Sequence, residues 1–448
     1  MNIENLKSVL LVNLVVISVF LTFNLWTYVP DSSKLQNAKY LQDNAEMEQK
    51  SLTNVIFPSV VLFHKENTHL GSEDIDSIDP LYKLLERGEL YDFRDISNDI
   101  PKHQFLSFVR GKDKIEMIFP THIPLDSMKD VFTIKEKVPE SYSFNRILID
   151  LQGSRDGNIP VYFISYENRK VYHMVLKGIS LKELETARDQ FAAKARDYSQ
   201  YTLSDTREIF LPDTKTDRQS MVYLISNIPE DIFINALFTD PRYVKKMSDD
   251  QEDTYTDGIR LMQVLKKKQM LQYTNSAISD QSHIYGSTLV QRSFDFINSH
   301  GGLTDSYRFD YMNSKKGQTT YRLYVDSLPV FNESGMATLE QVWGVDELIS
   351  YKRPLFKLSR SGLKYGDDRT ISLPDGKTVI QSLEKNEKVD MKLIQDIRLG
   401  YKLTPELGTD GKNIAAVNLK PIWYVVYGED NQVLEWSVEK GGDLIGLE

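Results

Sequence analysis

The sequence predicts an α+β protein, in which an N-terminal transmembrane helix precedes several extracytoplasmic domains built from antiparallel sheets. Three observations support this prediction. Residues 9–26 form an uncharged apolar run, strand patterns separated by turns recur along the rest of the chain, and helical patterns precede pairs of strands near the C-terminus. Helices that are followed by antiparallel strands pack on one face of a sheet, because each element must bury its apolar side.

The first element is a transmembrane anchor over residues 9–28, after a short cytoplasmic tail of residues 1–8. The apolar run has 18 residues, which is within the roughly 17–25 that cross a bilayer as a helix. Trp26 and Tyr28 follow where aromatic rings favour the headgroup region. A cleaved signal peptide is the alternative, but no small-residue cleavage pattern follows the run. The few Lys residues around the span hardly distinguish its two sides, so the short tail is the main reason to expect the N-terminus in the cytoplasm.

One face of the anchor is expected to bind partner helices. Asn13 and Asn24 are the only amides of the span, and their 11-residue spacing brings them within roughly 20° of each other on a helix. Ile17 and Phe20 lie between them on the same face. Amide hydrogen bonds stabilise helix association in lipid, so these four residues form a predicted partner-binding stripe. Alternatively, Asn24 reaches the outer headgroups and Asn13 is tolerated in an apolar span.

The composition limits the classes of partner and of chemistry. The net charge is −10, which disfavours nucleic acid and anionic headgroups as partners, because both select for clustered Lys and Arg. The chain has no cysteine, so disulfides, thiolate catalysis and Cys-based metal sites are excluded. The hydrophobic content of 41% is typical of a folded protein, and the length after the anchor requires several domains.

We expect a juxtamembrane linker and three α+β domains after the anchor. The linker covers residues 29–52, and the domains cover residues 53–177, 178–280 and 281–448. Strands are predicted over residues 56–63, 105–109, 115–119, 147–151, 161–166, 170–176, 207–211, 221–226, 259–264, 269–273, 307–311, 320–325, 338–343, 348–351, 394–403, 419–427 and 433–438. Helices are predicted over residues 80–87, 124–131, 229–238, 289–299 and 378–383, and after Ser180, where Glu183 completes a capping box. In the last domain, a helix followed by antiparallel strands occurs twice.

Motifs for catalysis and for metal binding are incomplete. The glycine-rich nucleotide loops, the serine-hydrolase elbow and the zinc-protease helix are all absent from the sequence. Ser382 and Lys385 match only the first element of penicillin-recognising enzymes. An acidic run lacks the glycine of a calcium loop and is expected to be a solvated loop, with a divalent site as the alternative: Asp249, Asp250, Glu252, Asp253 and Asp257. We therefore predict no catalytic residue, no cofactor-binding residue and no metal ligand.

The histidines and tryptophans favour structural roles. His64 and His69 are expected to share neither a helix face nor a strand face. His300 follows a predicted helix, where the helix dipole favours an imidazolium. Core packing is expected for three tryptophans in strand-like runs: Trp343, Trp423 and Trp436.

Several short strings resemble one known family. They are NLWTY-x-P at 24–30, YTDGIR at 255–260, PVF at 329–331, WG at 343–344, YKRPLF at 351–356, LGYKLT at 399–404 and PIWYVVY at 421–427. In this order they resemble the YycH (WalH) family, regulatory proteins encoded beside the WalK–WalR (YycG–YycF) two-component system of low-GC Gram-positive bacteria. The resemblance covers the whole chain. Basic residues before the span are fewer than is usual in that family.

The resemblance implies a membrane-anchored, extracytoplasmic regulator without catalytic residues. It implies that residues 281–448 are similar to the paralogous protein YycI. It further implies a complex with YycI and with the sensor histidine kinase WalK, formed in part by transmembrane helices, which tunes cell-wall metabolism. Whether the kinase is inhibited or activated is left open. Two other classes remain: a cell-wall enzyme or its inhibitor, and a ligand-binding sensor with a pocket between domains.

Overall fold

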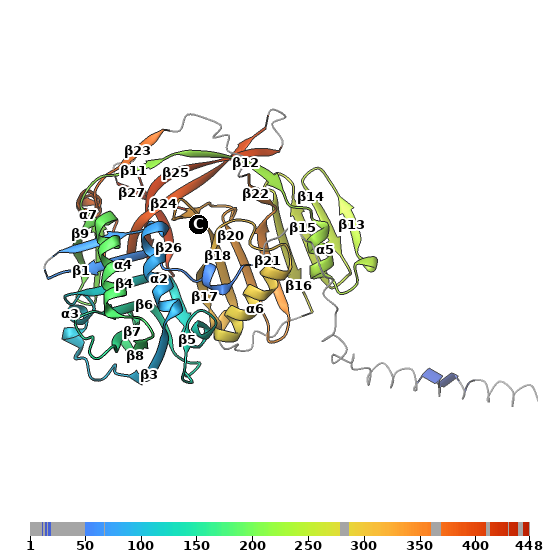
Figure 1. Cartoon of the computed structure of the whole chain (residues 1–448). Coiled ribbons are helices and arrows are strands. Elements are labelled where there is room, and N and C mark those ends of the chain that lie inside the picture. The colour runs from blue at the N-terminus through green and yellow to red at the C-terminus, as the bar shows by residue number, and fades with distance from the viewer. Residues whose placement is uncertain are drawn as a thin grey trace, which may run out of the picture. The chain divides into compact units, whose positions relative to one another are not determined.

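The computed structural model describes residues 50–66, 68–277, 286–359, 369–408, 413–428, 430–437 and 442–447, together with Leu11, Leu14, Val15, Ile17 and Ser18. The chain divides into two compact units, Met1–Ala45 and Glu46–Glu448. In the first unit, the five described residues are helical and exposed. None of the helices, as far as their residues are described, is long and apolar enough to span a bilayer. Figure 1 shows the elements of the second unit.

The first sheet of the second unit contains ten strands in the order β10-β9-β2-β1-β4-β6-β7-β8-β3-β5. Every neighbouring pair is antiparallel except β3 with β5. The strands are β1 (Val60–His64), β2 (His69–Ser72), β3 (Glu89–Asp95), β4 (Lys114–Pro124), β5 (Thr133–Ile134), β6 (Ser143–Asp150), β7 (Ile159–Ser165), β8 (Lys170–Lys177), β9 (Arg196–Ser204) and β10 (Arg207–Pro212).

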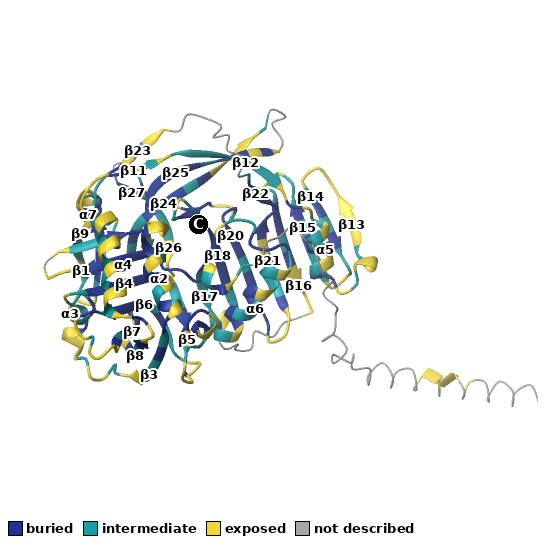
Figure 2. Cartoon of the chain, in the orientation of Figure 1, coloured by how far each residue is buried: buried dark blue, intermediate teal, exposed yellow. Residues whose placement is uncertain are grey.

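Two long helices cover one face of this sheet, and a short helix covers part of the other. Helices α2 (Ile75–Arg87) and α4 (Leu181–Lys194) pack against alternate residues such as Val61 and Phe63. Helix α3 (Phe105–Val109) packs on the opposite face, against Leu148 and Ile164. Figure 2 shows buried strands behind helices whose outer faces are exposed.

The second sheet contains fifteen strands, and the main path is β13-β14-β15-β16-β21-β20-β18-β19-β24-β25-β12-β22. Strand β17 pairs with β18, β26 pairs with β25, and β27 pairs with β26. The strands are β12 (Met221–Asn227), β13 (Lys245–Ser248), β14 (Glu252–Thr256), β15 (Arg260–Leu265), β16 (Met270–Asn275), β17 (Tyr307–Asn313), β18 (Gln318–Val325), β19 (Leu328–Phe331), β20 (Thr338–Trp343), β21 (Leu348–Pro354), β22 (Phe356–Leu358), β24 (Ile394–Leu407), β25 (Ile414–Tyr427), β26 (Gln432–Ser437) and β27 (Asp443–Gly446).

The remaining elements are three helices, a strand pair and short 3-10 turns. The helices are α5 (Asp231–Leu237), α6 (Gly286–Ser299) and α7 (Gly376–Lys385), and the pair is β11 (Thr216–Gln219) with β23 (Thr370–Leu373). The 3-10 turns are η2 (Leu52–Asn54), η3 (Lys102–Gln104), η4 (Leu125–Asp130), η5 (Pro241–Tyr243), η6 (Ser314–Lys316) and η7 (Met391–Leu393).

The helix-then-strands pattern near the C-terminus occurs twice, as the sequence predicts. Helix α6 precedes the antiparallel pair β17–β18, and α7 precedes the antiparallel pair β24–β25. Strand β19 joins the two groups, because it pairs with β18 on one side and, in parallel, with β24 on the other. The mostly antiparallel sheets with packed helices confirm the α+β class.

The two sheets share one hydrophobic core. A single cluster of buried residues runs from Leu52 to Trp436 and includes side chains from both sheets. Strands β9 and β10 extend the first sheet past the boundary expected at residue 177, and β12–β16 belong to the second sheet. The region 178–280 therefore contributes to both sheets.

Some elements differ from their predictions. Residues 105–109 form a helix rather than a strand, because Phe105 and Val109, one helical turn apart, bury against the sheet together. The helix predicted over 80–87 begins at Ile75, where Asp74 caps it. Pro80 is tolerated inside α2 because the carbonyl that it leaves unbonded belongs to the exposed Asp76.

The capping box is confirmed. The Ser180 hydroxyl accepts a hydrogen bond from the Glu183 N–H at 3.2 Å, and the Glu183 carboxylate accepts from the Ser180 N–H at 2.9 Å. Residues 124–131, expected as an α-helix, form the tighter turn η4 instead.

Candidate functional site

A group of charged side chains lies on the face of the first sheet opposite α2 and α4. His64, Glu116 and Arg146 come from the neighbouring strands β1, β4 and β6. Alternation along each strand sends them to the same side, away from Val61, Ile115 and Ile147. His64 and Glu116 are fully buried and Arg146 nearly so. Charged residues are rarely buried without a partner, so this cluster is the first candidate site.

Glu116 stands between two nitrogen donors. Its Oε2 atom lies 2.9 Å from Nε2 of His64, and its Oε1 atom forms an ion pair with the guanidinium of Arg146. Burial raises the pKa of Glu116, but the charge of Arg146 and the hydrogen bonds from His64 and Arg146 outweigh it and lower the pKa to about 2. The guanidinium also lies 3.4 Å from the centre of the Tyr166 ring, a cation–π contact. The carboxylate is therefore ionised at neutral pH.

His64 and His69 are in direct contact, so the prediction that they share no face is wrong. They are cross-strand partners in the β1–β2 hairpin, and their Nδ1 atoms lie 2.8 Å apart. The predicted strand ends at Phe63, whereas β1 includes His64 and the turn after it brings His69 opposite His64. Two residues that flank a tight turn between strands face the same side of the sheet. Recognising the hairpin would have been enough to find the pair.

Strand β10 closes over this cluster. The Phe210 ring lies 5.2 Å from the His64 ring and 4.7 Å from the His69 ring, between ring centres. The Glu208 N–H donates to the Tyr166 hydroxyl at 3.1 Å, and Arg110 forms an ion pair with the Glu208 carboxylate at 3.1 Å. The sheet therefore curls, so that its edge strand covers strands near its middle.

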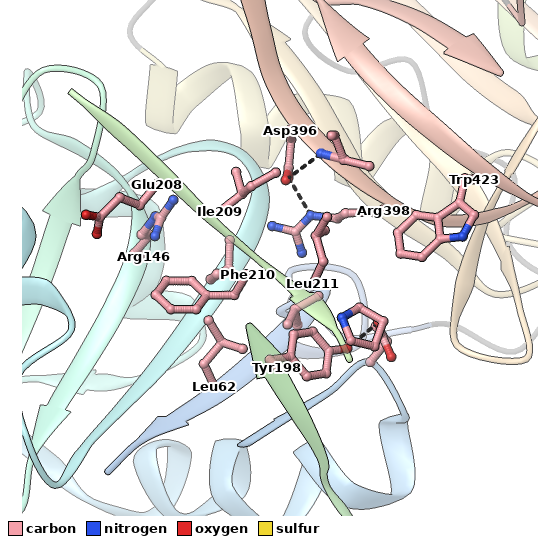
Figure 3. Close-up of a pocket in the computed structure, with 15 residues that line it drawn as sticks. Leu62, Arg146, Tyr198, Glu208, Ile209, Phe210, Leu211, Asp396, Arg398 and Trp423 are labelled. Atoms are coloured by element: carbon pink, nitrogen blue, oxygen red, sulfur yellow. Dashed lines mark hydrogen bonds and ion pairs between the residues drawn. The ribbon is translucent and has the colours of Figure 1, made fainter. Parts of the chain in front are cut away.

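A small cavity lies beside the cluster, where the two sheets meet. Figure 3 shows Leu62, Tyr198 and Phe210 from the first sheet, facing Arg398 and Trp423 from β24 and β25. Its volume is about 20 Å³, which is room for about one water molecule. This cavity is therefore too small for the small-molecule ligand of a sensor.

Further ion pairs line the same cavity. Glu73 accepts hydrogen bonds from Arg196 at 2.8 Å and from the Tyr198 hydroxyl at 2.5 Å. Across the cavity, Arg398 forms an ion pair with Asp396. The Nε atom of Arg146 is buried without a protein partner among the described residues. Charged side chains from both sheets thus meet at one junction. This arrangement is suited to coupling the position of one sheet to that of the other.

A second arrangement resembles a catalytic triad. His122 lies 2.9 Å from the Glu167 carboxylate and 3.4 Å from the Ser165 hydroxyl. The serine is only 2% exposed, and its oxygen already accepts a hydrogen bond from Asn168 at 2.9 Å. A buried nucleophile cannot be reached by a polymeric substrate, so the arrangement supports the sheet rather than a reaction.

The acidic run is expected to be a solvated loop, but Glu252 and Asp253 lie in strand β14 and Asp253 is buried. Its carboxylates form local contacts. Asp249 accepts hydrogen bonds from the N–H groups of Gln251 and Glu252, and Asp253 pairs with Lys246 and Lys266. No group of three or more potential metal-ligating side chains occurs in the part of the chain that the structure describes.

The other singled-out residues have structural contacts. The Ser382 hydroxyl accepts a hydrogen bond from the Trp436 indole at 3.3 Å. His300 follows α6 as expected; burial lowers its pKa, although the hydrogen bond to the Phe296 carbonyl at the end of the helix acts in the opposite direction. The core assignment of the tryptophans is confirmed, since all three are nearly or fully buried: Trp343, Trp423 and Trp436.

The predicted partner-binding stripe falls mostly outside the described residues. Ile17 is helical and 53% exposed, which leaves its side chain available for contacts. Asn13, Phe20 and Asn24 lie outside the described residues. The stripe therefore stays a prediction.

Comparisons with known proteins identify relatives over the whole length. In the crystal structure of YycH from Bacillus subtilis the fold is similar, with a TM-score of 0.72, 20% identity, and coverage of 90% of this chain and 98% of that chain. The chain is also 24% identical over 460 residues to the "Two-component system WalR/WalK regulatory protein YycH" of Bacillus subtilis (strain 168), with 99% of each covered.

Family profiles agree with these relatives. The profile described as "YycH protein, N-terminal domain" matches residues 4–193, and the one described as "YycH protein, C-terminal domain" matches residues 206–440. Together they account for nearly all of the chain, and the protein belongs to the YycH family.

Proposed function

We propose that this protein is a membrane-anchored accessory regulator of the sensor histidine kinase WalK, acting in complex with YycI to tune cell-wall metabolism. The observation that carries the proposal is the match over 99% of both chains to a relative named as a WalR/WalK regulatory protein. A match of that extent includes the N-terminal segment as well as both sheets. The protein acts by binding rather than by catalysis.

The proposed location is the cell membrane, with one span over residues 9–28. The N-terminus is cytoplasmic and the domains after residue 30 are extracytoplasmic. The uncharged run of residues 9–26 supports this topology, since its length fits a single helical span. Protease added to intact protoplasts should then degrade most of the chain, whereas full protection would overturn the topology.

The experiment for the complex is affinity purification of the tagged full-length protein from detergent-solubilised membranes. WalK and YycI should be recovered together. A variant whose anchor, residues 9–28, is replaced by an unrelated transmembrane helix is the matched control, because it keeps the topology and removes the stripe. Recovery of neither protein with the native anchor would contradict the proposal.

A further inference from the structure

The contact between His64 and His69 requires a fixed number of protons. One Nδ1 atom must donate and the other must accept, so only one proton lies between the two atoms at 2.8 Å. The other nitrogen of His64, Nε2, lies 2.9 Å from the Glu116 carboxylate and donates to it. In the clasped state we assign Nδ1 of His64 as the donor and Nδ1 of His69 as the acceptor, so the hydrogen of His69 lies on its Nε2 atom. A proton bound to Nδ1 of His69 would then turn two N–H groups toward each other, and the contact would break.

Breaking the contact between the two histidines would affect the elements that pack around them. His64 is fully buried and held by Glu116, whereas His69 is only half-buried at the first position of β2. His69 is therefore the ring that can move. Both rings pack on Phe210 of β10, and β10 also lines the cavity opposite Arg398 of β24. Displacement of His69 would thus loosen the hairpin, the covering strand and the junction between the sheets.

We propose that the His64–His69 pair is an acid-sensitive clasp, which holds the β1–β2 hairpin under β10 at neutral pH and releases it when Nδ1 of His69 takes up a proton. The clasp is a property of the folded chain. Its use in signalling rests on the proposed extracytoplasmic location, where the protein would meet an acidified exterior.

The titration of His69 supports the proposed direction. Burial and the neighbouring His64 lower the pKa of His69 from 6.5 to about 4, with Glu116 opposing the shift. A released imidazole regains its ordinary pKa. Between about pH 4 and pH 6.5 the released state therefore binds more protons than the clasped state. The clasp is fully stable above this range and weakens as the pH falls through it.

The other titratable groups around the histidine pair do not cause the same loss of stability as the pH falls. Glu116 remains ionised throughout this range, because its pKa is about 2. Burial raises the pKa of Glu208 on β10, so acid favours its folded form and acts in the opposite direction. The remaining charged or titratable side chains around the pair are Lys114 on β4, Arg146 on β6, Arg110 after α3, Tyr166 after β7 and Tyr198 on β9. Tyrosine, lysine and arginine do not change charge between pH 4 and pH 6.5.

The test is hydrogen exchange of the full-length protein in detergent micelles at pH 7.5 and pH 5, with amide protection corrected for the intrinsic exchange rate at each pH. In the wild type, protection of β1, β2 and β10 should fall about tenfold at pH 5. In H69Q it should not fall at pH 5, because glutamine can bond to His64 but cannot take up a proton.

Two control variants separate the clasp from general acid sensitivity. H103Q changes an exposed histidine, and H173Q changes a histidine on β8 whose pKa is also lowered by burial. Both should keep the wild-type response of the hairpin. The proposal is overturned if hairpin protection in the wild type does not change with pH, a result that decides even if H69Q fails to fold. It is equally overturned if H69Q loses protection in acid as the wild type does.

Discussion

The backbone of Lys50 and the side-chain amide of Asn298 exchange two hydrogen bonds, each 3.0 Å long. Asn298 lies on α6, so a helix far along the sequence holds the chain at Lys50. The ammonium of Lys50 also donates to the carbonyl of Asp305 at 2.5 Å. Lys50, where the described part of the second unit begins, is thus fixed to α6 and to the segment before β17.

Replacing Asn298 with alanine should release this attachment. Both hydrogen bonds are lost, and a pair of this kind contributes about 1–3 kcal/mol in total. Limited proteolysis of the full-length protein should then show faster cleavage around residue 50 than in the wild type. Asn98→Ala, which changes an exposed asparagine, should leave the rate unchanged. Equal rates for all three proteins would mean that the contact does not hold the segment.

Glu116→Gln should be strongly destabilising. The substitution removes the charge that compensates Arg146, and breaking one side of a buried ion pair costs about 3–5 kcal/mol. The thermal midpoint of the full-length protein should fall clearly. Lys83→Ala is the control, since it breaks the exposed 2.6 Å pair of Lys83 with Asp79 and should leave the midpoint unchanged. If both variants had the same thermal midpoint as the wild type, the cluster would contribute nothing to stability.

Position 317 has no room for a side chain. Its φ angle is +60°, and a Cβ atom there would lie 2.2 Å from the carbonyl oxygen of Trp343. Gly317→Ala should therefore lower the thermal midpoint more than Gly178→Ala. Gly178 has a φ angle of +80° with no atom within 4 Å of the added Cβ, so the comparison isolates the clash from the backbone strain. Equal midpoints would show that β20 moves away without cost.

Local signals in the sequence were sufficient for several elements. The capping box at Ser180 depends on neighbouring residues and is observed as predicted, and the strands predicted over residues 161–166 and 170–176 nearly match β7 and β8. The short apolar run of residues 105–109 does not by itself distinguish a strand from a helix, because five such residues fit either equally well. Only its packing partners, which are distant in sequence, decide between the two.

The ionic cluster could not be predicted for the same reason. Glu116 lies between Ile115 and Met117 in β4, and this alternation is typical of a strand with one face in water. The face is buried because β10, far along the chain, closes over it. No residue near Glu116 in the sequence indicates that closure, whereas the α+β class follows from local strand and helix patterns.

Asn13→Leu should weaken the association with WalK or YycI while membrane insertion is unchanged. An interhelical amide hydrogen bond in lipid contributes about 0.6–2 kcal/mol, which corresponds to a loss of about 3- to 30-fold in affinity. Co-purification from membranes measures this loss, and Ser18→Ala is the control, since a serine can bond to its own helix.

Cysteine scanning adds a second test of the stripe, since the chain has no native cysteine. Crosslinks to the partners should peak at positions 13, 17 and 20. Uniform crosslinking around the helix, or wild-type association of Asn13→Leu, would rule the stripe out.

The most direct test of the regulatory role is reconstitution. Purified WalK is placed in vesicles alone, with YycI, or with YycI and this protein at equal amounts, and its autophosphorylation rate is measured. The account predicts that addition of this protein changes the rate severalfold, in one direction, and that the protein with an unrelated anchor does so less. An autophosphorylation rate that is the same with and without the protein, although all components are inserted, would contradict the account.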